Sequence, residues 1–185
     1  MQDAALFYAN KAKCPDFSLP EHFILATLHR AENTDSPERL QSIIAALEEI
    51  AREMPVVIPI HPRTRKKLQE LNFNFKQTRL QLVDPVGYLE MVYLLKHCSF
   101  VATDSGGLQK EAYFFKKYCI TLRTETEWVE LVEQGANIIT GWRYEDILNS
   151  YKQLKHTTKD VFSSPLYGDG QAGHIIIREL QRIDS

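Results

Sequence analysis

The chain has 185 residues, of which 44% are hydrophobic and 25% charged, and its formal net charge is −2. This length and composition predict one globular domain, residues 1–185, with a single well-buried core. The small net charge and the lack of long Lys/Arg runs argue against nucleic acid or an anionic membrane as a partner, because both require a concentrated basic face.

Cysteine usage and hydropathy bear on the compartment. Cys14, Cys98 and Cys119 lie far apart and lack metal-ligand spacing, so neither a disulfide framework nor a zinc site is expected. No segment reaches the roughly 18 apolar residues of a membrane span. Residues 1–13 are typical of an amphipathic helix with acid as well as base, unlike a signal peptide. The sequence therefore predicts a cytoplasmic protein in a reducing compartment.

Short apolar runs alternate with longer amphipathic stretches along the chain. In chain order, we expect a strand at 22–28, a helix at 36–53, a strand at 55–60, a helix at 64–71, a strand at 79–84, a helix at 87–98, a strand at 99–104, a helix at 107–117, a strand at 118–123, a helix at 126–135, a strand at 136–141 and helices at 144–156 and 171–183. Strands that are apolar throughout and separated by helices indicate a parallel sheet buried on both faces. The predicted fold class is therefore α/β, a doubly wound parallel sheet.

A possible anion site follows the fourth predicted strand, where the chain passes through Ser105, Gly106 and Gly107 into a helix. In such a sheet, ligands bind beyond the carboxyl ends of the strands, and helix N-termini attract anions. Glycine lets the backbone approach a phosphate closely. Alternatively, Asp104 and Ser105 merely cap the helix and the glycines merely form a tight turn. The residues by themselves favour neither interpretation.

Polar residues also follow the first two predicted strands. They are His29, Arg30, Glu32 and Asn33 after the first strand, and His61, Arg63 and Arg65 after the second. His29 is interpreted as functional, because a titratable group directly after an apolar strand is costly without a purpose. Arg63 and Arg65 are interpreted as residues of a solvated loop. Neither a GxGxxG fingerprint nor a GxxxxGK[ST] phosphate loop occurs, which disfavours dinucleotide binding and ATP hydrolysis.

Six segments together resemble one known family. They are "HRAEN", "PIHP", "VDPVGYLEMVYLLKHC", "TDSGGLQKEA", "LRTETEWVELVEQGANIITG" and "YGDGQA". In this order and spacing, they are similar to the C-terminal domain of the UDP-N-acetylglucosamine 2-epimerase family, over residues 22–172. The resemblance implies a nucleotide-sugar-binding domain, the Rossmann-like C-terminal half of a B-type glycosyltransferase architecture. The resemblance also implies that the family's N-terminal domain is absent from this chain.

The resemblance implies that several residues bind the nucleotide. Ser105, Gly106 and Gly107 match the turn whose amides and hydroxyl hold the diphosphate. Glu111 matches the carboxylate that binds the ribose hydroxyls, and Val86 matches a position that contacts uracil.

Four further positions complete the site that the resemblance implies. His29 matches the active-site histidine near the diphosphate and the reacting sugar. Met91 stands where many members carry an aromatic residue in the base pocket, and Trp128 stands where some members use an arginine on the nucleotide. Arg123, in the same loop as Trp128, could supply that positive charge instead.

The activity implied by the resemblance is inversion at C2 of a UDP-2-acetamido sugar, by elimination and re-addition of UDP. It requires no cofactor, no metal and no redox step. UDP or a UDP-sugar is the implied ligand. Because the family's carboxylates near the sugar lie largely in the N-terminal domain, this chain is expected to be inactive by itself. Two alternatives stay open, a stand-alone UDP-sugar binding or regulatory module and half of a B-type glycosyltransferase.

The last predicted helix is strongly apolar for a terminal segment. Its apolar residues are Ile175, Ile176, Ile177, Leu180 and Ile183. In the family this helix packs on the N-terminal domain, so the resemblance implies that residues 174–183 lack their partner here. They are expected to be frayed, packed differently, or buried against a second copy, with some tendency to form a homo-oligomer.

Overall fold

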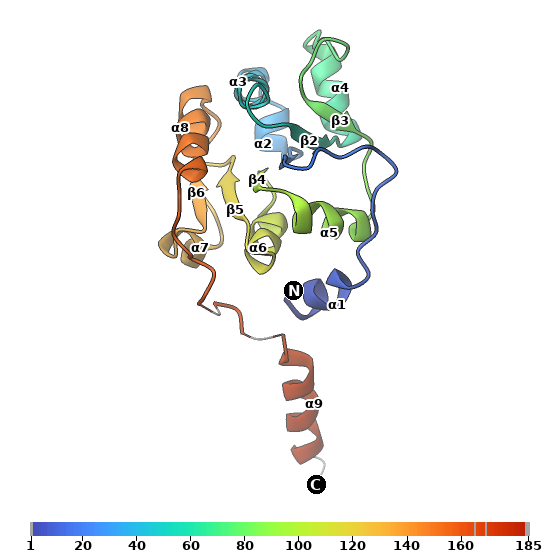
Figure 1. Ribbon diagram of the computed structural model, residues 1–185, viewed down its shortest axis with the longest axis vertical. Helices are drawn as coiled ribbons and strands as arrows, with labels where there is room; N and C mark the ends of the chain where they lie inside the picture. Colours follow the sequence, from blue (N-terminus) through green and yellow to red (C-terminus); the bar gives the residue numbers. More distant parts are fainter. Residues whose placement is uncertain (1, 165, 169, 184–185) are drawn as a thin grey trace.

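A sheet of six parallel strands forms the centre of the computed structural model, which describes residues 2–164, 166–168 and 170–183 (Figure 1). The strands are β1 (Ile24–Thr27), β2 (Val56–Pro59), β3 (Gln81–Val83), β4 (Phe100–Thr103), β5 (Tyr118–Thr121) and β6 (Asn137–Ile139). Their order across the sheet is β3-β2-β1-β4-β5-β6, so the direction of winding reverses between β1 and β4. This arrangement confirms the predicted doubly wound parallel sheet.

Helices cover both faces of the sheet. They are α1 (Gln2–Ala9), α2 (Ala31–Thr34), α3 (Pro37–Ile50), α4 (Pro62–Glu70), α5 (Tyr88–His97), α6 (Gly106–Phe114), α7 (Val129–Glu133), α8 (Tyr144–Lys155) and α9 (Ala172–Ile183). Figure 1 shows α3, α4 and α8 on one side of the sheet, and α5 and α6 with α1 beneath them on the other. Among the described residues, no helix combines the length and apolarity needed to cross a membrane.

The core is divided into two layers by the alternation of side chains along the strands. On β1, Ile24 and Ala26 pack into the cluster under α3 and α8, whereas Leu25 packs into the cluster under α5 and α6. The preceding Phe23 belongs to the second cluster as well. Successive strand residues point to opposite faces, so a strand buried on both sides must be apolar at every position.

Three helical segments differ from the prediction for local reasons. Helix α4 begins at Pro62 rather than at residue 64, because Nδ1 of His61 accepts the backbone N–H of Arg63 at 3.2 Å and so caps the helix. Helix α7 is confined to Val129–Glu133 because the hydroxyl of Thr126 accepts the N–H of Trp128 at 3.1 Å, which forms a turn instead of a helical start. The short helix α2 is not among the predicted elements.

Helix α9 stands away from the rest of the molecule (Figure 1). The five apolar residues that the sequence singles out are between 53% and 79% exposed. The backbone N–H of Gly173 donates to Oδ2 of Asp3 at 3.1 Å, which ties the start of α9 to α1. The segment is therefore helical rather than frayed, and its apolar side has no cover in the described part of the chain.

Candidate functional site

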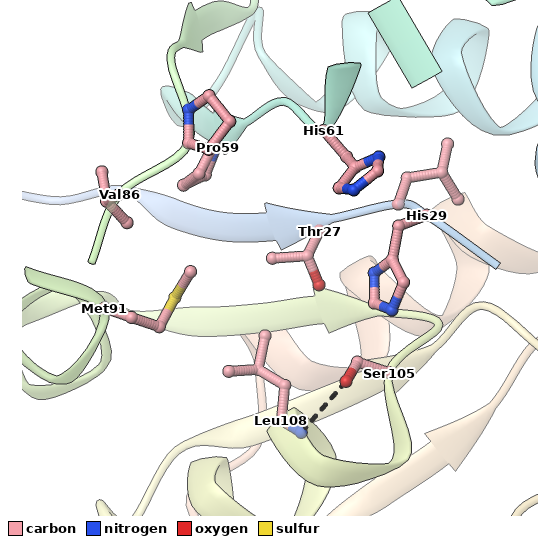
Figure 2. A pocket seen from close by; sticks show the side chains of 10 residues that line it. Thr27, His29, Pro59, His61, Val86, Met91, Ser105 and Leu108 are labelled. Atoms are coloured by element: carbon pink, nitrogen blue, oxygen red, sulfur yellow. Dashed lines mark hydrogen bonds between the residues drawn. The ribbon is translucent and has the colours of Figure 1, made fainter. Parts of the chain in front are cut away.

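A pocket of about 200 Å³ lies at the carboxyl ends of β1, β2 and β4, beside the point where the winding reverses. Its lining is Thr27, Leu28, His29, Pro59, His61, Pro85, Val86, Met91, Ser105 and Leu108. Figure 2 shows Val86 and Met91 at one end of the pocket, and His29 and Ser105 at the other. Ligands of doubly wound sheets bind at this position, so the pocket is the candidate site.

The Ser-Gly-Gly turn (Ser105, Gly106 and Gly107) begins α6 at the edge of this pocket. The hydroxyl of Ser105 accepts the backbone N–H of Leu108 at 3.4 Å, as an N-cap does. Within the described residues, the amides of Gly106 and Gly107 have no acceptor. The turn therefore presents two open N–H groups at the positive end of a helix, which is the arrangement that binds anions.

Asp104 has a different role from the helix cap that the sequence allowed. Its side chain is fully buried, and Oδ2 accepts the backbone N–H groups of His29 at 3.1 Å and Arg30 at 3.0 Å. Oδ2 also accepts Nδ2 of Asn33 at 3.3 Å. The carboxylate is thus directed across the sheet and fastens the loop between β1 and α2, which leaves capping of α6 to Ser105 alone.

Glu111 lies one turn into α6, outside the pocket lining. The hydroxyl of Tyr88, at the start of α5, donates to Oε1 of Glu111 at 3.1 Å. Burial raises the pKa of Glu111. Burial and the nearby Glu111 carboxylate raise the pKa of Tyr88 to about 12. The two side chains form a polar pair beyond the Ser-Gly-Gly turn. The Glu111 carboxylate, which accepts the hydrogen bond, is only partly shielded from water.

Arg123 is buried and already paired. Its Nη1 donates to both carboxylate oxygens of Glu127 at 2.9 Å, and Nη2 of Arg30 lies 3.8 Å from the same carboxylate. The backbone N–H of Glu127 and the Arg123 guanidinium lower the pKa of Glu127. A Cβ atom on Gly106 would lie 3.0 Å from Oε2 of Glu127. A carboxylate therefore stands between Arg123 and the Ser-Gly-Gly turn.

Trp128 supports the turn from the same loop. Its indole Nε1 donates to the carbonyl oxygen of Gly106 at 2.7 Å. The ammonium group of Lys110 lies 3.9 Å from the centre of the Trp128 ring, close enough for a cation–π contact. Trp128 thus fixes the first residue of α6 through its side chain.

The predicted site residues fall into two groups. His29, Val86, Met91 and Ser105 line the pocket together, and Gly106 and Gly107 continue the turn at its edge. Glu111 and Arg123 lie outside the lining, at either side of the turn.

Two predicted loop residues belong to a helix instead. Arg63 and Arg65 lie on α4, where Arg63 pairs with Asp35 and Arg65 pairs with Asp84 at 3.2 Å. The cap at His61 brings Arg63 into the helix, whereas Arg65 already falls within the helix predicted at 64–71. Both side chains remain partly exposed, in keeping with their interpretation as solvated residues.

Sequence reasoning missed Asp104 as a residue that orders the site, and it missed Tyr88 and Glu127. Glu127 pairs with Arg123 four residues earlier, but this segment is not helical, so the i,i+4 spacing typical of helical ion pairs gave no signal there. The bond between Tyr88 and Glu111 joins two different helices, so no local spacing indicates it.

The strand order, with a pocket and an open helix N-terminus where the winding reverses, defines a Rossmann-like α/β domain. A family model described as UDP-N-acetylglucosamine 2-epimerase matches residues 1–181. The chain therefore belongs to the UDP-N-acetylglucosamine 2-epimerase family, as the resemblance of its motifs predicts.

Curated relatives agree with this assignment. The UDP-2,3-diacetamido-2,3-dideoxy-D-glucuronate 2-epimerase of Pseudomonas aeruginosa is 50% identical, over 99% of this chain and 51% of that protein. A UDP-N-acetylglucosamine 2-epimerase homolog of Methanococcus maripaludis is 43% identical, over 87% of this chain and 45% of its own length. The chain spans about half the length of the curated relatives that it matches.

Solved structures share this fold over about half of their own length. The UDP-GlcNAc 2-epimerase of Methanocaldococcus jannaschii, in complex with UDP-GlcNAc and UDP, superposes with a TM-score of 0.83 at 36% identity, over 98% of this chain and 52% of that one. The enzyme of Neisseria meningitidis bound to UDP-GlcNAc gives a TM-score of 0.81 at 29% identity, over 98% and 53%. The fold is the Rossmann-like half of a B-type architecture.

Proposed function

We propose that residues 1–185 are the UDP-binding half of an epimerase that inverts C2 of a UDP-2-acetamido sugar. The observation that carries the proposal is the Ser-Gly-Gly turn, whose two open amides lie at a helix N-terminus beside the pocket. The P. aeruginosa relative is named for a UDP-2,3-diacetamido uronate. Sugars of that class are therefore the first substrates to test, followed by UDP-N-acetylglucosamine.

The proposed pose places the diphosphate on the Ser-Gly-Gly turn and the uracil between Val86 and Met91. Glu111 then accepts the ribose hydroxyls. Its position supports this role, because five residues of helix advance about 7.5 Å from Gly106, which suits a ribose whose phosphates lie on the helix N-terminus. Arg123 would supply positive charge to the diphosphate only after separating from Glu127, because the Glu127 carboxylate lies between its guanidinium and the turn.

The chemistry that follows is elimination and re-addition. The C2 proton is removed and its bond electrons form a C1=C2 double bond as the C1–O bond to UDP breaks. Re-addition of UDP at C1 and delivery of a proton to the other face of C2 give the inverted sugar. The open amides stabilise the departing diphosphate, and His29 transfers a proton near it.

We further propose that the carboxylates needed near the sugar belong to an N-terminal half. Support comes from the length of the relatives, of which this chain spans about half, and from the exposed apolar side of α9, which offers a docking surface. By itself the chain is then a UDP-binding domain without epimerase activity.

The first test is the binding of UDP to the chain alone. We expect weak binding by isothermal titration, with NMR shifts concentrated at the Ser-Gly-Gly turn and Glu111. The absence of both heat and shifts at millimolar UDP would refute the proposed site.

Glu111→Ala separates the ribose contact from the diphosphate contact. A charge-assisted hydrogen bond contributes about 1.5–3 kcal/mol, so we expect UDP affinity to fall roughly tenfold or more. Inorganic pyrophosphate, which has no ribose, should bind the variant and the parent alike. Glu133→Ala, on the exposed surface of α7, is the matched control. Equal losses for both ligands would contradict the role of Glu111.

Activity is tested by mixing the chain with the separately produced N-terminal half of the P. aeruginosa relative. Exchange of the C2 hydrogen with solvent should require both halves, and His29→Ala should slow it about a hundredfold or more. His22→Ala, at the opposite end of β1, is the control. Exchange by this chain alone would overturn the half-enzyme proposal. UDP binding without exchange in any mixture would favour a stand-alone binding module.

A further inference from the structure

Asp104 contacts His29 in two ways. Besides accepting its backbone N–H, the carboxylate approaches the imidazole, and Oδ1 lies 3.5 Å from Nδ1. The carboxylate is fully buried, whereas the His29 side chain is 43% exposed and lines the pocket. One end of the ring is therefore directed to a buried anion and the other remains available to a ligand.

Three N–H donors compensate the desolvation of the Asp104 carboxylate. They are the backbone amides of His29 and Arg30 and the side-chain amide of Asn33. His29 and Arg30 lie in the loop between β1 and α2, and Asn33 lies on α2 directly after it, so the loop that carries the imidazole is fixed to the end of β4. An asparagine could accept from the loop through its single oxygen. Only a carboxylate offers acceptors to the loop and to the ring at once.

From this geometry we propose that Asp104 is a positioning residue that holds His29 as the Nδ1–H tautomer and thereby presents the Nε2 lone pair to the pocket. The partner of one ring nitrogen decides which nitrogen carries the proton. This inference rests on the proton-transfer role proposed for His29. In that role Nε2 is the atom that accepts a proton, and the resulting imidazolium lies next to a buried anion.

Figure 2 shows where the His29 ring lies in the pocket. The imidazole of His29 lies beside Ser105, at the end of the pocket where the Ser-Gly-Gly turn begins. A proton carried by Nε2 would therefore be close to the proposed diphosphate.

The test uses the imidazole ¹⁵N chemical shifts of the chain alone, which report the tautomer without UDP and without activity. Above the titration range of histidine, His29 should show a protonated Nδ1 and an unprotonated Nε2. The exposed His22 and His156 should show the mixture of an unconstrained histidine and serve as internal references. His29→Gln assigns the signal.

Asp104→Asn should shift His29 toward the tautomer mixture of the two reference histidines. Asn33→Ala is the matched control, since it removes another donor to the same carboxylate and leaves the ring contact in place. The proposal is overturned if His29 of the parent chain already shows the reference mixture, a result that does not depend on whether any variant folds. It is also overturned if folded Asp104→Asn keeps the parent tautomer. Failure of UDP to bind would refute the proposed function and leave the tautomer result standing.

Discussion

At the scale of one residue, the Glu111 carboxylate is proposed to bind the ribose, and the same carboxylate lowers the stability of the fold without ligand. Its pKa is raised chiefly by burial, and the Tyr88 hydroxyl offsets only part of that effect. A carboxylate that lacks full compensation is unfavourable in the empty site. The ribose hydroxyls of a nucleotide would supply the missing donors, so the stability lost here is recovered on binding.

A pH dependence follows from the raised pKa of Glu111. The folded chain binds this proton more tightly than the unfolded chain, so the free energy of unfolding falls as pH rises from the ordinary value of 4.5 through the raised one. Glu111→Gln keeps an acceptor for Tyr88 and removes this loss. In urea unfolding, the variant should gain stability relative to the parent between pH 4 and pH 7. An identical difference at both values would contradict the prediction.

Sequence reasoning at this scale succeeds where the location of a residue follows from its position in the chain. His29 and Ser105 could be placed at the pocket because each directly follows a strand of a parallel sheet. The partners of Asp104 could not be placed, because its bonds to the β1–α2 loop span more than 70 residues of sequence. Such contacts depend on the adjacency of β1 and β4, which only the assembled sheet establishes.

At the scale of elements, the backbone at the N-terminus of α6 forms the proposed diphosphate site. Gly106 lies against Glu127, and a Cβ atom there would also lie 3.7 Å from Nη2 of Arg30. A methyl group there would therefore press on the Glu127 carboxylate, and either Glu127 or the turn would have to shift. Glycine is needed at this position for space rather than for an unusual backbone angle, since Gly106 is not among the positive-φ residues.

Gly106→Ala should weaken binding of both UDP and pyrophosphate, in contrast to Glu111→Ala. Its effect on the free energy of unfolding should stay within about 1 kcal/mol, because alanine favours helix over glycine and offsets part of the contact with Glu127. Gly173→Ala is the control at the start of α9, where an added Cβ meets no atom within 4 Å. Titration calorimetry would contradict the prediction if the Gly106 variant bound pyrophosphate as the parent does.

The order of elements could be predicted almost completely, since apolar runs and helical periodicity are properties of local sequence. Segments fixed by side-chain bonds could not. The hydroxyl of Thr126 delays α7, and the imidazole of His61 advances α4, although neither residue breaks the hydrophobic pattern. Helix α2 spans only four residues, too few for a periodicity to show.

At the scale of the whole molecule, α9 is a helix whose apolar side the described part of the chain leaves uncovered. Its apolar side is exposed at five positions, and a hydrogen bond from Gly173 to Asp3 joins its first turn to α1. An uncovered apolar helix face of this kind favours association.

We expect the chain to self-associate through α9 as its concentration rises in sedimentation velocity. Replacing Ile176 and Leu180, which lie four residues apart on one side of the helix, with lysine should keep it monomeric without changing UDP affinity. Arg178→Glu on the same helix controls for altered charge. Addition of an N-terminal half should also dissociate the oligomer, and a parent chain that stays monomeric at every concentration would refute the prediction.

The attachment of α9 to α1 through its first turn has a kinetic consequence. Helices of about 12 residues are only marginally stable in water without packing, so the amide hydrogens of α9 should exchange with solvent far sooner than those of the buried strands. Any partner that covers the apolar side would slow that exchange along the whole helix. The protection of the α9 amides therefore measures the fraction of chains that are bound to a partner. The measurement needs neither a label nor an assay of turnover.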